Sequence, residues 1–97
     1  MVYSRFLTVV DDERWRFEVE FWQGLAFIHA TFRRKVAAMR AARELFPQLK
    51  RWLAEVGHEF SYVYIPVGDE KLHRFEKLFG FRDMCVLNGH VFMAQRN

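Results

Sequence analysis

The fold is decided by residues 63–81, which read VYIPVGDEKLHRFEKLFGF. An apolar run over residues 60–67 predicts a buried β-strand. Asp69 then stands where a helix N-cap is expected, because its carboxylate can accept hydrogen bonds from the free N–H groups of the first turn. An amphipathic helix is expected over residues 70–79, and Gly80 ends it because glycine adopts the left-handed conformation easily. The stretch therefore predicts a strand followed by a short helix in an α/β domain.

Three strands are expected before this unit. Residues 3–10 are rich in β-branched and aromatic side chains. Residues 15–22 alternate between apolar and polar side chains, which is typical of a half-buried strand. Residues 25–32 are apolar on both faces apart from two positions, so this strand is expected to be central. Gln23 and Gly24 form the predicted hairpin turn between the last two strands.

A long helix is predicted over residues 35–56, where apolar side chains recur every three to four residues. Pro47 either kinks this helix or opens a second one, because proline lacks an N–H group and clashes with the preceding turn. Residues 84–87 and 90–95 form a terminal hairpin around Asn88-Gly89. The predicted order is β-β-β-α-β-α-β-β, in one domain with a mixed sheet, because the β-α-β part requires a parallel crossover.

The composition limits the classes of function. The chain has 97 residues, of which 52% are apolar, and a net charge of +3, which is too small to indicate nucleic-acid binding by itself. No apolar run is long enough to span a membrane, and the first residues do not resemble a signal peptide, so a cytoplasmic or virion setting is expected. Cys85 is the only cysteine, and its apolar surroundings predict a buried thiol.

Residues 60–92 resemble the last βα unit of the GCN5-related N-acetyltransferase (GNAT) fold, in which a helix ends in a Gly-Phe pair after an apolar strand. The ending NGHVFMAQR, residues 88–96, is similar to that of short GNAT-like proteins of tailed phages, including internal virion proteins. The resemblance implies a minimal GNAT-like domain. It lacks the usual N-terminal helices, because only residues 11–14 separate the first two strands and one helical turn already needs 3.6 residues.

Two departures from the GNAT pattern bear on activity. The family binds the cofactor's pyrophosphate with a glycine-containing loop, but residues 31–39 contain no glycine. Arg33, Arg34 and Lys35 are the candidate cofactor-binding residues there, since cations attract the phosphates of acetyl-CoA. Glu76 occupies the position of the family's tyrosine general acid. We expect Glu76 to be a solvated helix residue, and no cofactor is expected to bind in the family manner.

The catalytic candidates, if the protein is an enzyme, are His29, Glu18 and Glu20. The resemblance implies that a base lies on the strand before the long helix, or that a carboxylate on the central strands deprotonates an amine through water. From the residues alone, His29 is expected to be a hydrogen-bonded core or rim histidine. The two glutamates are expected to face solvent. The four histidines have no metal-ligand spacing, so no metal site is predicted.

The sequence therefore favours a non-catalytic interaction or structural protein, encoded by a phage and acting as a virion component or an anti-defence factor. Its partner would be a second copy, a virion protein or a host protein. The missing helices are expected to leave residues 15–28 bare for an interface, with Trp15, Phe17, Phe21 and Trp22 as contacts. The alternative is a small acetyl-CoA-dependent N-acetyltransferase. A third hypothesis is a nucleic-acid-contacting protein that uses the basic residues between 33 and 51.

Overall fold

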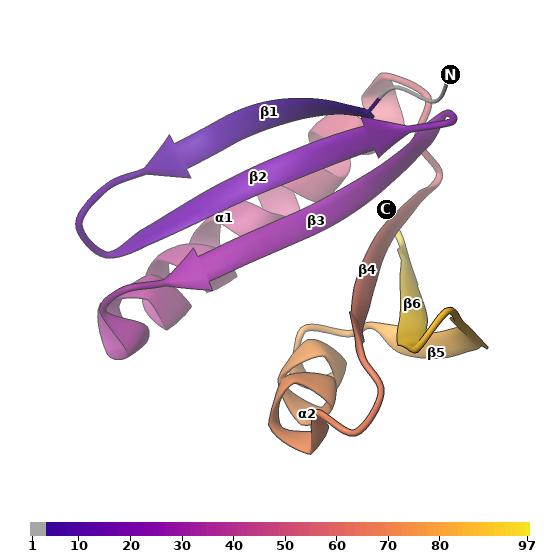
Figure 1. The fold of residues 1–97 in the computed structure, drawn as a ribbon. Coiled ribbons are helices and arrows are strands. Elements are labelled where there is room, and N and C mark those ends of the chain that lie inside the picture. The colour runs from indigo at the N-terminus through magenta and orange to yellow at the C-terminus, as the bar shows by residue number, and fades with distance from the viewer. Residues whose placement is uncertain (1–3) are drawn as a thin grey trace.

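The computed structural model describes residues 4–97, which form an α/β domain with a six-stranded mixed sheet (Figure 1). The strands lie in the order β1-β2-β3-β4-β6-β5. The predicted order of elements is confirmed, although the expected strand start at Tyr3 lies outside the described residues. The elements are β1 (Ser4–Asp11), β2 (Trp15–Trp22), β3 (Leu25–Phe32), α1 (Lys35–Glu55), β4 (Phe60–Pro66), α2 (Glu70–Leu78), β5 (Arg82–Leu87) and β6 (His90–Arg96).

Two tight hairpins fix the register of the antiparallel strands. Gln23 and Gly24 both have positive φ angles, of 49° and 77°, and Asn88 and Gly89 repeat this with 50° and 75°. Such turns match the right-handed twist of the strands they join. β2 and β3 consequently pair along their whole length. Because side chains alternate along a strand, this register decides which residues face the helices.

The hydrophobic core lies between α1 and one face of the sheet. Val63 and Ile65 are 3% and 2% exposed, as predicted for β4. Trp15 and Phe17 are 1% and 4% exposed on the same face, so they are not available to a partner. The core is formed by alternate residues of the strands and by one stripe of α1: Trp15, Phe17, Val19, Ala26, Ile28, Ala38, Ala42, Phe46, Leu49, Leu53, Val63, Ile65, Phe81 and Met93.

The long helix continues through Pro47 without a break. α1 is one helix from Lys35 to Glu55, and Pro47 lies on its exposed side. α2 begins as predicted, because the Asp69 side chain accepts a hydrogen bond from the Leu72 backbone N–H at 3.1 Å. Pro47 therefore does not open a second helix.

One burial prediction is wrong. Cys85 is exposed, because it lies on β5, which forms the edge of the sheet and, within residues 4–97, pairs with β6 alone. Every residue of β5 is exposed. The apolar run around Cys85 thus belongs to an edge strand, on which apolar side chains on either face can meet solvent.

The sheet separates in its middle, between the parallel strands β3 and β4. β3 and β4 pair only at Ala26↔Ser61 and Phe27↔Tyr62, near the start of both strands. Beyond these pairs the two strands diverge, with α2 beside the lower part of β4 (Figure 1). Phe75 on α2 packs against Phe32 at the end of β3, with ring centroids 5.2 Å apart. Helix side chains therefore close the gap on the core side.

The face of the sheet opposite the core is rich in aromatic side chains. We call it the open face, because the core side chains of α1 and α2 pack on the other face. The register places these side chains of β1, β2, β3, β4 and β6 on it: Phe6, Glu18, Glu20, Trp22, Phe27, His29, Tyr62, Tyr64, His90 and Phe92. Neither helix within residues 4–97 has the length and apolar character needed to cross a membrane.

Candidate functional site

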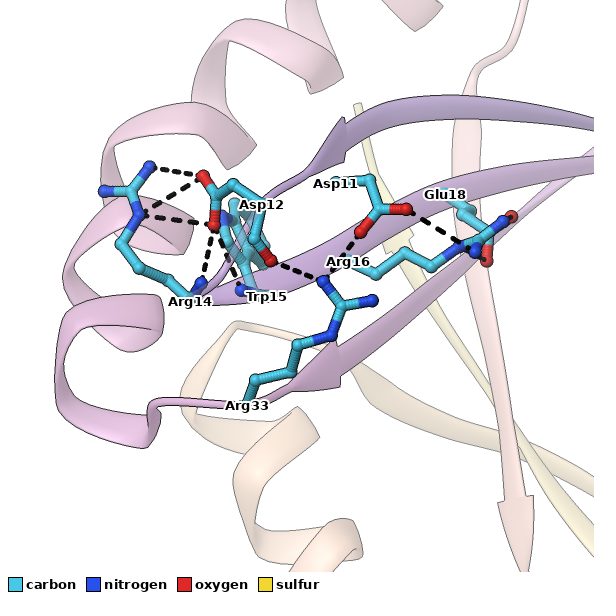
Figure 2. Close-up of polar contacts among 7 residues, drawn as sticks. All are labelled: Asp11, Asp12, Arg14, Trp15, Arg16, Glu18 and Arg33. Atoms are coloured by element: carbon cyan, nitrogen blue, oxygen red, sulfur yellow. Dashed lines mark hydrogen bonds and ion pairs between the residues drawn. The ribbon is translucent and has the colours of Figure 1, made fainter.

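The turn between β1 and β2 is organised by Asp12 (Figure 2). Its carboxylate accepts hydrogen bonds from the backbone N–H groups of Arg14 at 2.8 Å and Trp15 at 3.2 Å. The Arg14 guanidinium also donates to it, with Nη2 2.8 Å from Oδ2. These bonds favour the ionised carboxylate, and the Arg14 side chain is the main reason that the pKa of Asp12 falls to about 2. The turn is therefore held in one conformation by its own side chains.

Arg33 binds this turn instead of standing free for a phosphate. Its Nη1 lies 2.7 Å from Oδ1 of Asp11 and also donates to the backbone carbonyl of Asp12, as Figure 2 shows. The Arg34 guanidinium lies 3.6 Å from the Glu13 carboxylate. Lys35 is exposed in the first turn of α1. The structure thus keeps the three predicted cofactor-binding residues next to one another but uses two of them in ion pairs within the chain.

The backbone amides of the β3–α1 connection are also occupied. The N–H groups of Arg33 and Arg34 both donate to the backbone carbonyl of Arg14, each at 2.8 Å. A phosphate cradle requires N–H groups that point at the ligand and have no partner of their own. This connection therefore acts as a structural junction between β1–β2 and α1.

A polar cluster lies on the open face, where the structure brings two of the catalytic candidates together. His29 Nε2 and Glu20 Oε1 are 2.8 Å apart, and the Tyr64 hydroxyl donates to the same oxygen at 3.2 Å. Burial, and then the charge of Glu20, raise the pKa of Tyr64. His29 is a hydrogen-bonded rim residue, as expected from the sequence. Tyr64 was not among the candidates, although its alternation with Val63 and Ile65 already places it on the opposite face.

The expectation that both glutamates face solvent is wrong. The side chains of Glu18 and Glu20 are only 19% and 14% exposed. Glu18 does not join the His29 cluster, because it pairs with Arg16, whose Nε lies 3.0 Å from Glu18 Oε1. Strand alternation correctly puts both carboxylates on one face, but neighbouring side chains on that face then shield them from water.

Glu76 is also less exposed than expected. It lies on α2 beside a small apolar cavity between the helices and β2–β3, with about 30 Å³ of room for the centres of water-sized molecules. Burial raises the pKa of Glu76 to about 7. The cavity is lined mainly by aromatic residues: Trp15, Phe17, Phe32, Phe46, Phe75, Phe79 and Phe81. A carboxyl group in such surroundings can be protonated near neutral pH and can then donate a proton.

Over residues 4–97, no three histidine, cysteine, aspartate or glutamate side chains come together in a way that could hold a metal ion. Comparisons with protein-family models, with curated proteins and with solved structures give no match for this chain. Three places in the fold therefore bear on function: the open face, the β3–α1 connection and the Glu76 cavity.

Proposed function

We propose that this chain is a non-catalytic, GNAT-like interaction protein of phage origin, and that it binds a protein partner through its open face. The observation that carries the proposal is the uncovered aromatic surface. Of its aromatic side chains, Phe6 and Tyr64 are 56% and 37% exposed, whereas Phe27 is only 5% exposed; the aliphatic Leu87, on the adjoining strand β5, is 56% exposed. Contiguous apolar surface of this kind usually marks a contact with another molecule. The partner would be a virion protein, a host defence component or a second copy of the chain.

The β3–α1 connection supports the non-catalytic part of the proposal. Its two amides already donate to the Arg14 carbonyl, and Arg33 already binds Asp11. A pyrophosphate could use these two amides or Arg33 only by displacing their present partners. We expect acetyl-CoA to bind with a Kd above about 1 mM, which corresponds to roughly 4 kcal/mol or less of binding free energy.

Calorimetric titration with acetyl-CoA tests this point. Weak or absent binding is the expected result, and a low-micromolar Kd would contradict the proposal. If such binding occurred, an Arg33→Ala/Arg34→Ala variant should lose most of it. Light scattering at micromolar concentration then separates a second copy of the chain from a different protein as the partner.

A small N-acetyltransferase is the second candidate, and two observations favour it. β3 and β4 pair at only two positions, so a gap opens in the backbone pairing beside α2, and the GNAT resemblance implies that β4 and α2 form one wall of an acetyl-CoA slot. Glu76 stands near that gap with a pKa of about 7, suited to proton donation. An acetylation assay over a panel of amines, with Glu76→Gln expected to lose activity, tests this candidate.

Nucleic-acid contact through α1 is the third candidate. Lys35, Arg40 and Arg43 line one exposed groove on α1, with about 530 Å³ of room for water-sized molecules. Phosphate contacts by such cations weaken steeply with salt. Binding to mixed-sequence DNA or RNA that falls as salt rises, and that Arg40→Ala/Arg43→Ala removes, would favour this function over the first.

A further inference from the structure

The open face contains one hollow that combines a carboxylate with aromatic walls. Around Glu20 stand Trp22, Phe27, Tyr64, His90 and Phe92, contributed by β2, β3, β4 and β6. The hollow has about 300 Å³ of room for water-sized molecules, which is within the range of small-ligand sites. We call it the anchor pocket. Its place on the open face makes it the natural centre of the interface proposed above.

The carboxylate of the anchor pocket is only partly neutralised by its neighbours. Oε1 of Glu20 accepts from His29 and Tyr64, and neither donor carries a permanent positive charge. Within residues 4–97, Oε2 of Glu20 has no hydrogen-bond partner, and no lysine or arginine pairs with this side chain. A carboxylate that is shielded from water raises the free energy of the folded protein unless it pairs with a cation. The pocket therefore lacks a positive group that would complete it.

The walls of the pocket select the kind of cation. The rings of Tyr64 and Phe92 have centroids 5.6 Å apart, and Phe27 meets Tyr64 edge to face at 5.6 Å. Aromatic faces attract cations, and arginine is found there more often than lysine. A guanidinium is planar and weakly hydrated, so it can stack on a ring while donating to a carboxylate. A lysine ammonium is more strongly hydrated and loses more on entering such a site.

We propose that the anchor pocket binds an arginine side chain of the protein partner, with the guanidinium against the aromatic walls and an N–H donated to Glu20. This inference rests on the proposed function, because it names the group by which the partner is recognised. Charge and shape complementarity at one central side chain is the usual pattern of an interface hot spot, where arginine is enriched.

The test is an NMR titration of the full chain with the capped peptide Gly-Gly-Arg-Gly-Gly. We expect saturable, millimolar binding, with the largest shifts at Glu20, Tyr64 and Phe92. The same peptide with citrulline, which is neutral but has nearly the same shape, should bind about tenfold more weakly or not at all. The lysine peptide should also bind more weakly than the arginine peptide.

Two variants assign the effect to the pocket. Glu20→Gln keeps the size and an acceptor oxygen but removes the charge, so binding should weaken about tenfold. Glu18→Gln is the matched control on the same strand and face, because Glu18 pairs with Arg16 outside the pocket, and it should bind as the wild type does. Phe92→Leu provides a second pocket variant if Glu20→Gln does not give a native spectrum.

Several results would overturn the inference: no binding of the arginine peptide, equal binding of the citrulline or lysine peptide, or shifts confined to other surfaces. The outcome is separable from that of the proposed function. Low-micromolar acetyl-CoA binding would contradict the non-catalytic function and leave an observed arginine site standing. A negative peptide titration with no acetyl-CoA binding would remove only the anchor pocket.

Discussion

At the scale of single residues, Glu76 links local packing to pH. Its pKa rises from 4.5 to about 7 because its surroundings are apolar. The protonated form therefore stabilises the folded state fully below pH 4.5, and this contribution is lost as the pH rises through 7. The loss of unfolding free energy amounts to roughly 3 kcal/mol, since each unit by which the folded-state pKa exceeds the unfolded-state pKa corresponds to about 1.4 kcal/mol.

Glu76→Gln should therefore remove this pH dependence. We expect the variant to match the wild type in urea unfolding at pH 4 and to be more stable at pH 8, by up to roughly 3 kcal/mol, because glutamine cannot ionise. Glu70→Gln, on an exposed position of the same helix, is the control and should show no such gain. An equal stability difference at both pH values would mean that the Glu76 carboxyl is hydrated.

Asp12 shows the opposite shift, because hydrogen bonds favour its charged form. Its pKa is about 2, below the ordinary value of 3.8. The stabilisation is present above pH 3.8 and is lost as the pH falls through 2. Carbon-13 NMR titration of the carboxyl should give a midpoint near 2, and Arg14→Ala should move it back up, since the Arg14 side chain is the main cause. A midpoint unaffected by Arg14→Ala would assign the shift to the backbone donors.

Residue-level predictions from the sequence succeeded where local chemistry decides and failed where distant elements decide. The cap by Asp69 is a local contact, so it could be predicted from four residues. The burial of Glu76 depends on β2, β3 and α1, which are far away in the chain. The exposure of Cys85 depends on β5 being an edge strand, and an apolar run gives no sign of that. The partnership of Glu20 with Tyr64 likewise joins separate strands.

At the scale of elements, Pro47 makes α1 less stable than a helix with another residue at this position would be. Pro47 supplies no N–H to the carbonyl of Arg43, one turn earlier, and it lies on the exposed side of the helix. Pro47→Ala should therefore stabilise the protein by up to about 3 kcal/mol in urea unfolding. Gln48→Ala, at the next exposed position, should change the free energy of unfolding by less than about 0.5 kcal/mol. No gain for Pro47→Ala would show that the helix accommodates the ring without loss.

The end of α2 depends on a glycine for two reasons. Gly80 has a φ of 93°, and a Cβ atom there would lie 2.7 Å from Nε2 of Gln95. Gln95 is held in place because it donates to the Phe79 carbonyl and accepts from Lys50. Gly80→Ala should cost about 2–3 kcal/mol, from backbone strain and disrupted hydrogen bonds.

Gly24→Ala is the matched control, since Gly24 has a φ of 77° but, among residues 4–97, no atom within 4 Å of the added Cβ. It should lower the free energy of unfolding by about 1 kcal/mol, from backbone strain alone. Thermal or urea unfolding of both variants measures the difference. Equal losses would show that Gln95 moves aside at no cost.

The elements themselves could be predicted well, because hydrophobic period and turn residues are local signals. The two hairpin turns and the strand at Phe60–Pro66 follow from them. The continuity of α1 through Pro47 could not be predicted, because the sequence allows both a kink and a second helix. Packing of Phe46 and Leu49 against the sheet, on either side of the proline, holds the two halves in one helix.

At the scale of the whole molecule, stability is expected to be uneven across the sheet. β2 pairs on both sides and has buried residues at its core face, whereas β5 pairs on one side only and every residue is exposed. Local opening should therefore be much easier at β5. Hydrogen exchange at neutral pH should be at least about 100-fold faster for the amides of β5 than for those of β2. Equal protection would indicate that another molecule covers β5 in solution.

The short pairing between β3 and β4 has a mechanical consequence. The two halves of the sheet meet at Ala26 and Ser61, both 0% exposed, and diverge from there. Few backbone hydrogen bonds therefore join the two halves of the sheet, and close packing at Ala26 and Ser61 has to hold them together there. A larger side chain at Ala26 would meet this packing directly, so we expect it to weaken the junction between the two halves.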